Sequence, residues 1–114
     1  MHDTNATYLT MIKALSDDTR LKITGMLASG TLCACDILES FQITQPTLSY
    51  HMKLLTACHL VRAQRIGAWM HYTLETNQYQ QLLEFMADLI VPNPASARVP
   101  SSTCCPRKVK EANQ

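Results

Sequence analysis

The feature that most constrains this fold is a three-residue connector, Gln42-Ile43-Thr44, between two segments with helical periodicity. The first segment spans about 32–41 and the second about 44–59. Thr44 is suited to cap the second helix, and Pro46 is tolerated because it falls in the first turn. Two helices joined by so short a turn predict a helix-turn-helix, whose second helix enters the DNA major groove.

Directly after the second helix the sequence pattern changes from that of a helix to that of strands. Residues 61–65 form a basic strand pattern and 69–74 an aromatic one, and Gly67 between them indicates a tight turn. A β-hairpin at this position is the wing of a winged helix. We therefore predict a mainly α winged helix-turn-helix fold with four helices, two strands and a last helix.

Apolar stripes flank this motif on both sides. The first helix is predicted from Tyr8, Met11, Ile12 and Leu15. The second is predicted to be capped by Ser16 and to stop near Gly30, and the last to begin with a Thr76 cap. The stripe of the last helix consists of Tyr79, Leu82, Leu83, Met86 and Leu89. Because so small a domain can hardly bury both stripes, we predict that the first and last helices form a homodimer interface.

A length of 114 residues with 46% apolar residues suits one domain, which we expect over 1–90. From 91 to 114 the chain is rich in Pro, Ser, Ala and Lys, which predicts a flexible tail containing Cys104 and Cys105. No apolar run approaches the length of about 18 residues that a membrane span requires, so no membrane partner is expected. The first residues do not resemble a secretory signal, which predicts a cytoplasmic protein with reduced thiols.

The formal net charge is only +1, yet the charges are unevenly distributed. Between Ser40 and Leu74 the chain has three lysine or arginine residues, three histidines and no acidic residue. This composition predicts a cationic surface over the second helix of the motif and the hairpin.

The polar face of that second helix is suited to double-stranded DNA. Gln45, Thr47 and Ser49 lie near its N-terminus, the part that contacts base edges in recognition helices. The predicted DNA-binding residues are Thr44, Gln45, Thr47, Ser49, Tyr50, His51, Lys53, Arg62 and Arg65. We expect Tyr50, His51 and Lys53 to contact phosphates or to frame the groove, and the two arginines to reach the backbone or the minor groove. The alternative is an ordinary amphipathic helix with a solvated polar face.

The five cysteines are an odd number in a chain without a signal sequence, which argues against a disulfide framework and favours metal binding or redox sensing. On a helix that begins at Leu32, Cys33 and Cys35 would point about 200° apart. One ion bound by both would therefore distort the first turn, and we expect this distortion to displace the DNA-reading helix. A helix N-terminus also favours the thiolate form.

Residues 14–23, 31–38 and 44–53 strongly resemble the ArsR/SmtB family of metal-sensing repressors, and the likeness covers about 8–90. The resemblance implies a homodimeric winged helix that is not an enzyme and that leaves its operator when an effector binds. The Cys-x-Cys sequence is similar to the arsenic- and antimony-responsive branch, which implies As(III) or Sb(III) as effector and no permanent cofactor.

These trivalent ions favour three sulfur donors, and members of the arsenic branch often have a third cysteine where this chain has Leu38. Our predicted metal site comprises Cys33 and Cys35 with help from Cys104 and Cys105 of the tail. Cys58, a small-molecule thiol or water are other candidates for the third donor. Cys58 is also interpretable as a core residue, and the tail cysteines as an independent thiol pair.

Three alternatives use the same cysteines. A redox-responsive repressor would switch through a Cys33–Cys35 or Cys104–Cys105 disulfide. A cadmium or lead sensor would add N-terminal cysteines, but none precedes Cys33. A thiol oxidoreductase is disfavoured because the chain has neither Cys-x-x-Cys nor a βαβ order.

A zinc site on the last helix is disfavoured because residues 76–90 contain no histidine.

Overall fold

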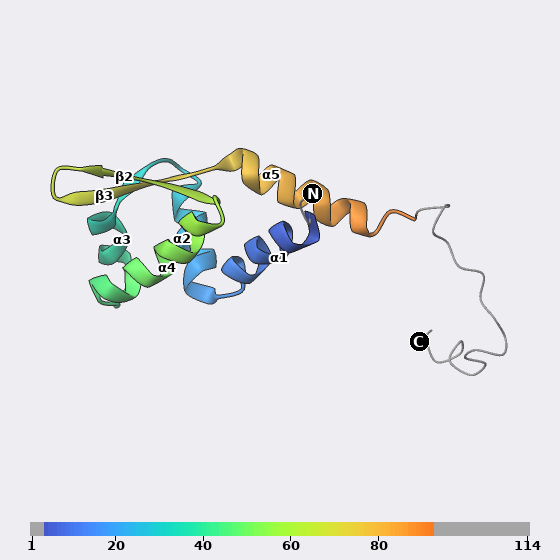
Figure 1. Ribbon diagram of the computed structural model, residues 1–114. Helices are drawn as coiled ribbons and strands as arrows, with labels where there is room; N and C mark the ends of the chain where they lie inside the picture. The colour runs from blue at the N-terminus through green and yellow to red at the C-terminus, as the bar shows by residue number, and fades with distance from the viewer. Residues whose placement is uncertain (1–3, 93–114) are drawn as a thin grey trace, which may run out of the picture.

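The computed structural model describes residues 4–92 and confirms the winged helix-turn-helix fold (Figure 1). The elements are α1 (Thr4–Leu15), α2 (Asp18–Leu27), β1 (Leu32–Cys33), α3 (Ala34–Ser40), α4 (Gln45–Ala57), β2 (Val61–Ile66), β3 (Trp69–Leu74) and α5 (Thr76–Leu89). Beyond Pro92 the predicted tail, with Cys104 and Cys105, lies outside the described residues.

Two of the predicted helix caps differ from the structure by one residue. The cap of α2 is Asp17 rather than Ser16, and its carboxylate accepts a hydrogen bond of 3.1 Å from the Arg20 amide. At α5 the cap position is Glu75, without a side-chain cap bond, rather than Thr76. The Thr44 cap of α4 is confirmed, because its hydroxyl accepts from the Thr47 amide at 3.3 Å.

The third helix begins two residues later than predicted, because Leu32 and Cys33 form a strand. This strand, β1, pairs antiparallel with β3, and Leu32 lies opposite Tyr72 while Cys33 lies opposite His71. The helical assignment was wrong here because a distant strand supplies the partner, and tertiary pairing overrides local periodicity. The sheet therefore has three strands in the order β1-β3-β2.

The predicted hairpin is confirmed, with β2 paired to β3 from Val61 opposite Leu74 to Ile66 opposite Trp69. Gly67 closes the turn with φ +66°, a left-handed conformation that glycine adopts without a steric penalty. In Figure 1 the hairpin extends past α3 and α4, as a wing does.

The core lies between the helix-turn-helix and the two helices that precede it. Its fully buried large side chains are Ile23, Leu27, Ile37, Leu48, Met52, Leu55 and Leu60. Three of them come from α4, whose apolar face is therefore fixed against the body of the domain. This packing directs the opposite, polar face of α4 outward.

Helices α1 and α5 lie side by side at the end of the domain opposite the hairpin tip (Figure 1). The rings of Tyr8 and Phe85 stack with centroids 4.3 Å apart. Only Leu82 of α5 is buried, whereas Leu83 and Leu89 are each 64% exposed. Among the described residues, no helix has the length and apolarity to cross a membrane.

Candidate DNA interface and thiol site

The outward face of α4 consists of polar side chains, as the sequence predicts. Its exposed residues, with the Thr44 cap, include Thr44, Gln45, Thr47, Ser49, Tyr50 and Lys53. Thr44 and Thr47 are joined by a hydroxyl–hydroxyl hydrogen bond of 3.0 Å. This bond orders the first turn of the helix, the part that reaches bases in a major-groove reader.

Two predicted DNA contacts are already engaged within the protein. The side chain of His51 is 12% exposed, and its Nδ1 lies 2.9 Å from Nη1 of Arg20. Arg62, at the base of the wing, donates to Glu75 Oε2 at 3.0 Å. Arg65 lies nearer the hairpin tip and is exposed. The sequence did not indicate either pairing, because both partners lie in other elements.

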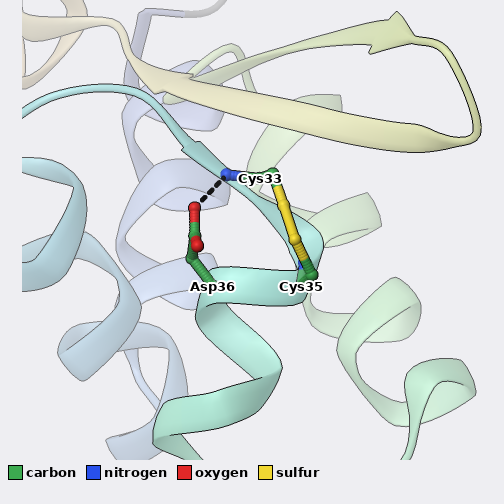
Figure 2. Close-up of a disulfide and its surroundings, with 3 residues drawn as sticks. All are labelled: Cys33, Cys35 and Asp36. Atoms are coloured by element: carbon green, nitrogen blue, oxygen red, sulfur yellow. Dashed lines mark hydrogen bonds between the residues drawn. A yellow bond between two sulfur atoms is a disulfide. The ribbon is translucent and has the colours of Figure 1, made fainter.

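Cys33 is the N-cap residue of α3, and its backbone is extended. Its sulfur accepts a hydrogen bond of 3.1 Å from the Cys35 amide. The Asp36 carboxylate in turn accepts one of 3.0 Å from the Cys33 amide (Figure 2). This reciprocal arrangement is a capping box, in which two otherwise unpaired backbone donors are satisfied.

The two sulfur atoms of the Cys-x-Cys sequence converge. Figure 2 shows them joined as a disulfide beside the Asp36 carboxylate. One ligand atom from each of Cys33, Cys35 and Asp36 lies within 4.8 Å of the others. The expectation that the sulfurs diverge by half a turn was therefore wrong, because Cys33 precedes the helix. The two sulfurs meet at the first turn without unwinding it.

Asp36 is the residue of this cluster that sequence reasoning missed. Its signal was the three-residue spacing from Cys33, which is the spacing of a capping box. Cys33 is buried, Cys35 is half-buried and Asp36 is exposed, so the cluster opens to solvent on one side.

Cys58 belongs to the core, in agreement with the simpler interpretation of its role. It is 6% exposed, and its thiol donates to the carbonyls of Leu54 and Leu55 at 3.4 and 3.5 Å. Burial raises the pKa of the Cys58 thiol, which disfavours the thiolate that binds soft ions.

The chain is similar to known proteins in sequence and in fold. Residues 17–63 match the arsR family of bacterial regulatory proteins. The arsenical resistance operon repressor of Staphylococcus aureus is 38% identical over 104 residues, which cover 91% of this chain and 92% of that protein. The chain belongs to the ArsR family. It is accordingly a transcriptional regulator of a DNA-binding family, and the oxidoreductase alternative is set aside.

Other relatives agree with this assignment to the ArsR family. An arsenical resistance operon repressor of Staphylococcus xylosus is 51% identical over 65 residues, covering 57% of this chain and 62% of that protein. Among solved structures, an ArsR family transcriptional regulator superposes with a TM-score of 0.71 at 19% identity, covering 78% of this chain and 92% of that one. HlyU from Vibrio cholerae superposes with a TM-score of 0.64 at 24% identity, covering 79% and 98%. At these identities the structures support the fold alone.

Proposed function

We propose that this ArsR-family protein is a cytoplasmic, homodimeric repressor that leaves its operator when As(III) or Sb(III) binds Cys33 and Cys35. The main support is the convergence of two sulfurs at the first turn of α3, in a chain whose relatives include arsenical resistance operon repressors.

In this proposal α4 enters the major groove of the operator. Gln45, Thr47 and Ser49 contact base edges, with Thr44 at the cap, while Tyr50 and Lys53 contact phosphates. Arg65 extends the contact along the wing. Because residues 40–74 include no acidic side chain, binding of a polyanion is favoured across this whole face. Arg62 reaches DNA only by breaking its ion pair with Glu75.

The donor chemistry of the thiol pair suits a thiophilic ion, because thiolates select soft metals and metalloids. The Asp36 carboxylate is a hard donor that already accepts from the Cys33 amide, so it is a poor substitute for a third sulfur. Leu38 supplies no donor. We therefore propose that Cys104 or Cys105 of the tail, or a small-molecule thiol, completes the coordination.

The position of Cys33 offers a route from the ion to the DNA. A thiolate that binds an ion donates electron density to it and becomes a weaker acceptor for the Cys35 amide, which weakens the cap of α3. Cys33 is also a residue of β1, so its displacement is transmitted to β3 of the wing. A coupling of this kind typically changes affinity by about 5–150-fold.

The proposed dimer interface comprises exposed apolar side chains of α1 and α5 and of the two residues that follow α5. These are Leu9, Leu83, Met86, Leu89, Ile90 and Val91. A twofold dimer through α1 and α5 would bury this surface and leave both copies of α4 exposed to successive major grooves.

The test uses reduced full-length protein and a duplex that the protein itself selects from a random library. Fluorescence anisotropy measures binding with and without arsenite or antimonite. We expect arsenite to weaken binding of the wild type and of Cys58→Ser, but not of the Cys33→Ser, Cys35→Ser double variant. A double variant that is released like the wild type would refute the assignment of the site.

The disulfide between Cys33 and Cys35 supports a second candidate, an oxidation-responsive repressor. In that case peroxide, rather than arsenite, would release the selected duplex from the wild type. Mass spectrometry of the released protein would then show the loss of two hydrogen atoms at this pair.

A further inference from the structure

Among the described residues, the charged side chain that is buried is that of Arg20, which is 8% exposed. It lies on α2, and its Nε donates to the carbonyl of Ala14 near the end of α1. Its Nη1 lies 2.9 Å from Nδ1 of His51 on α4. One guanidinium therefore joins the first two helices to the helix that carries the proposed DNA-reading face.

The chemistry of this contact defines the state of the histidine. A guanidinium has only donors, so Nδ1 of His51 must be the acceptor and the ring proton resides on Nε2. Asp17 completes the group, with its Oδ2 3.9 Å from the same Nδ1 and accepting from the Arg20 amide. The hydrogen bond from the Arg20 backbone amide, together with the positive charge of the Arg20 side chain, holds the pKa of Asp17 below its usual range.

The contact is also distinctive among those that hold α4. The buried side chains Leu48, Met52 and Leu55 provide apolar packing, which is not directional. Among the residues that the structure describes, the Arg20–His51 hydrogen bond connects α4 to another helix, whereas those of Thr44, Thr56 and Cys58 stay within α4 and its caps.

We infer that His51 is a positioning residue, which sets the orientation of α4 by accepting the hydrogen bond from Arg20 rather than by contacting DNA. This inference rests on the proposed function, in which α4 reads the operator. Loss of the acceptor leaves a buried guanidinium hydrogen unpaired, and this penalty favours a small displacement of α4 relative to α2.

Two variants separate positioning from direct contact. In His51→Asn the amide oxygen is close to the place of Nδ1 and still accepts, whereas His51→Leu has similar bulk and no acceptor. We expect His51→Leu to weaken binding of the selected duplex about 10-fold, and His51→Asn to restore most of that loss. The slope of log affinity against log salt should stay unchanged in both variants, because no phosphate contact is lost.

Arg20→Met provides the matched test from the other partner. It keeps the aliphatic stem but removes every donor, and Arg20 is only 8% exposed. We expect a loss like that of His51→Leu, and the Arg20→Met, His51→Leu double variant should lose no more than either single variant. Additive losses of affinity in the double variant would overturn the inference. Weak duplex binding by His51→Asn, with a shallower slope of log affinity against log salt, would also overturn it.

A measurement without DNA keeps the inference testable if a variant folds poorly. Nitrogen-15 NMR of the wild-type ring should show an unprotonated Nδ1 and a protonated Nε2, and the opposite tautomer would overturn the inference. Gln45→Ala and Ser49→Ala test the proposed function independently. If these leave binding unchanged while His51→Leu weakens it, the DNA-reading assignment fails but the positioning contact does not.

Discussion

Cys33 lies opposite His71 in the pairing of β1 with β3, so the residue that caps α3 is also bound into the sheet of the wing. The proposed sensor is therefore attached both to α3, the first helix of the helix-turn-helix, and to the wing. Thr31 and Thr73 reinforce the same junction through a hydroxyl hydrogen bond of 2.7 Å.

The first prediction concerns this junction. Arsenite added to the reduced protein should shift the backbone amide resonances of His71 and Thr73, because displacement of Cys33 disturbs the paired strand. Two-dimensional nitrogen–proton NMR measures this directly, and the Cys33→Ser, Cys35→Ser variant serves as control. Shifts confined to α3 would contradict transmission through the sheet.

The capping box makes a second prediction, on stability. Asp36→Ala should lower the free energy of unfolding by about 1 kcal/mol, because the Cys33 amide loses its acceptor. Urea unfolding of the reduced protein, followed by circular dichroism, measures the difference. Glu39→Ala changes another exposed acidic residue of α3 and should have a much smaller effect. Equal losses would argue against the capping role.

A third prediction follows from the burial of Cys58. In a variant with the other four cysteines changed to serine, the remaining thiol should react with Ellman's reagent much more slowly than a free thiol. The reason is that burial raises its pKa and blocks access. Labelling should become fast in denaturing urea, and rapid labelling in buffer would show that the site opens in the native protein.

The fourth prediction is a pH dependence due to Asp17. Its pKa in the folded protein is lowered, chiefly by the hydrogen bond from the Arg20 amide. The ionised carboxylate therefore stabilises the fold above the ordinary aspartate pKa of about 3.9, and this stability is lost as the pH falls through the folded-state value. The wild type should lose stability below about pH 4 more steeply than Asp17→Asn, as measured by thermal unfolding across the acid range. Parallel curves would contradict the assignment.

The fifth prediction tests the dimer. Leu83→Glu should convert the protein to a monomer, and its effect within one chain should be small because this side chain is 64% exposed there. Sedimentation velocity measures the state of association. Gln80→Glu adds the same charge at an exposed polar position of α5 and should leave the dimer intact.

Much of the fold was predictable because local signals agree with tertiary structure. Thr44 caps α4, Leu48 and Met52 face the core, and Gly67 closes the hairpin, each at the position that the sequence pattern indicates. These features depend on neighbours within a few residues, which periodicity and turn chemistry describe well.

The parts that were missed depend on distant partners. Strand β1 exists because β3 pairs with it, and Arg20 meets His51 across 31 residues of sequence. The sequence does not predict the pairing of Arg20 with His51, because an arginine or a histidine in a largely buried position can pair with many different polar groups. The same reason explains why convergence of the two sulfurs was missed, since it depends on where the strand ends and α3 begins.

The double role of Cys33 has a consequence for how such a regulator can lose its response. Serine is among the preferred N-cap residues, and its hydroxyl oxygen accepts the same amide hydrogen bond that the sulfur accepts here. Exchange of one sulfur atom for oxygen would thus preserve the architecture while abolishing affinity for a thiophilic ion. Under the proposed function, permanent silencing of the repressed genes would then require a single nucleotide substitution, and selection for the stability of the fold would not oppose it.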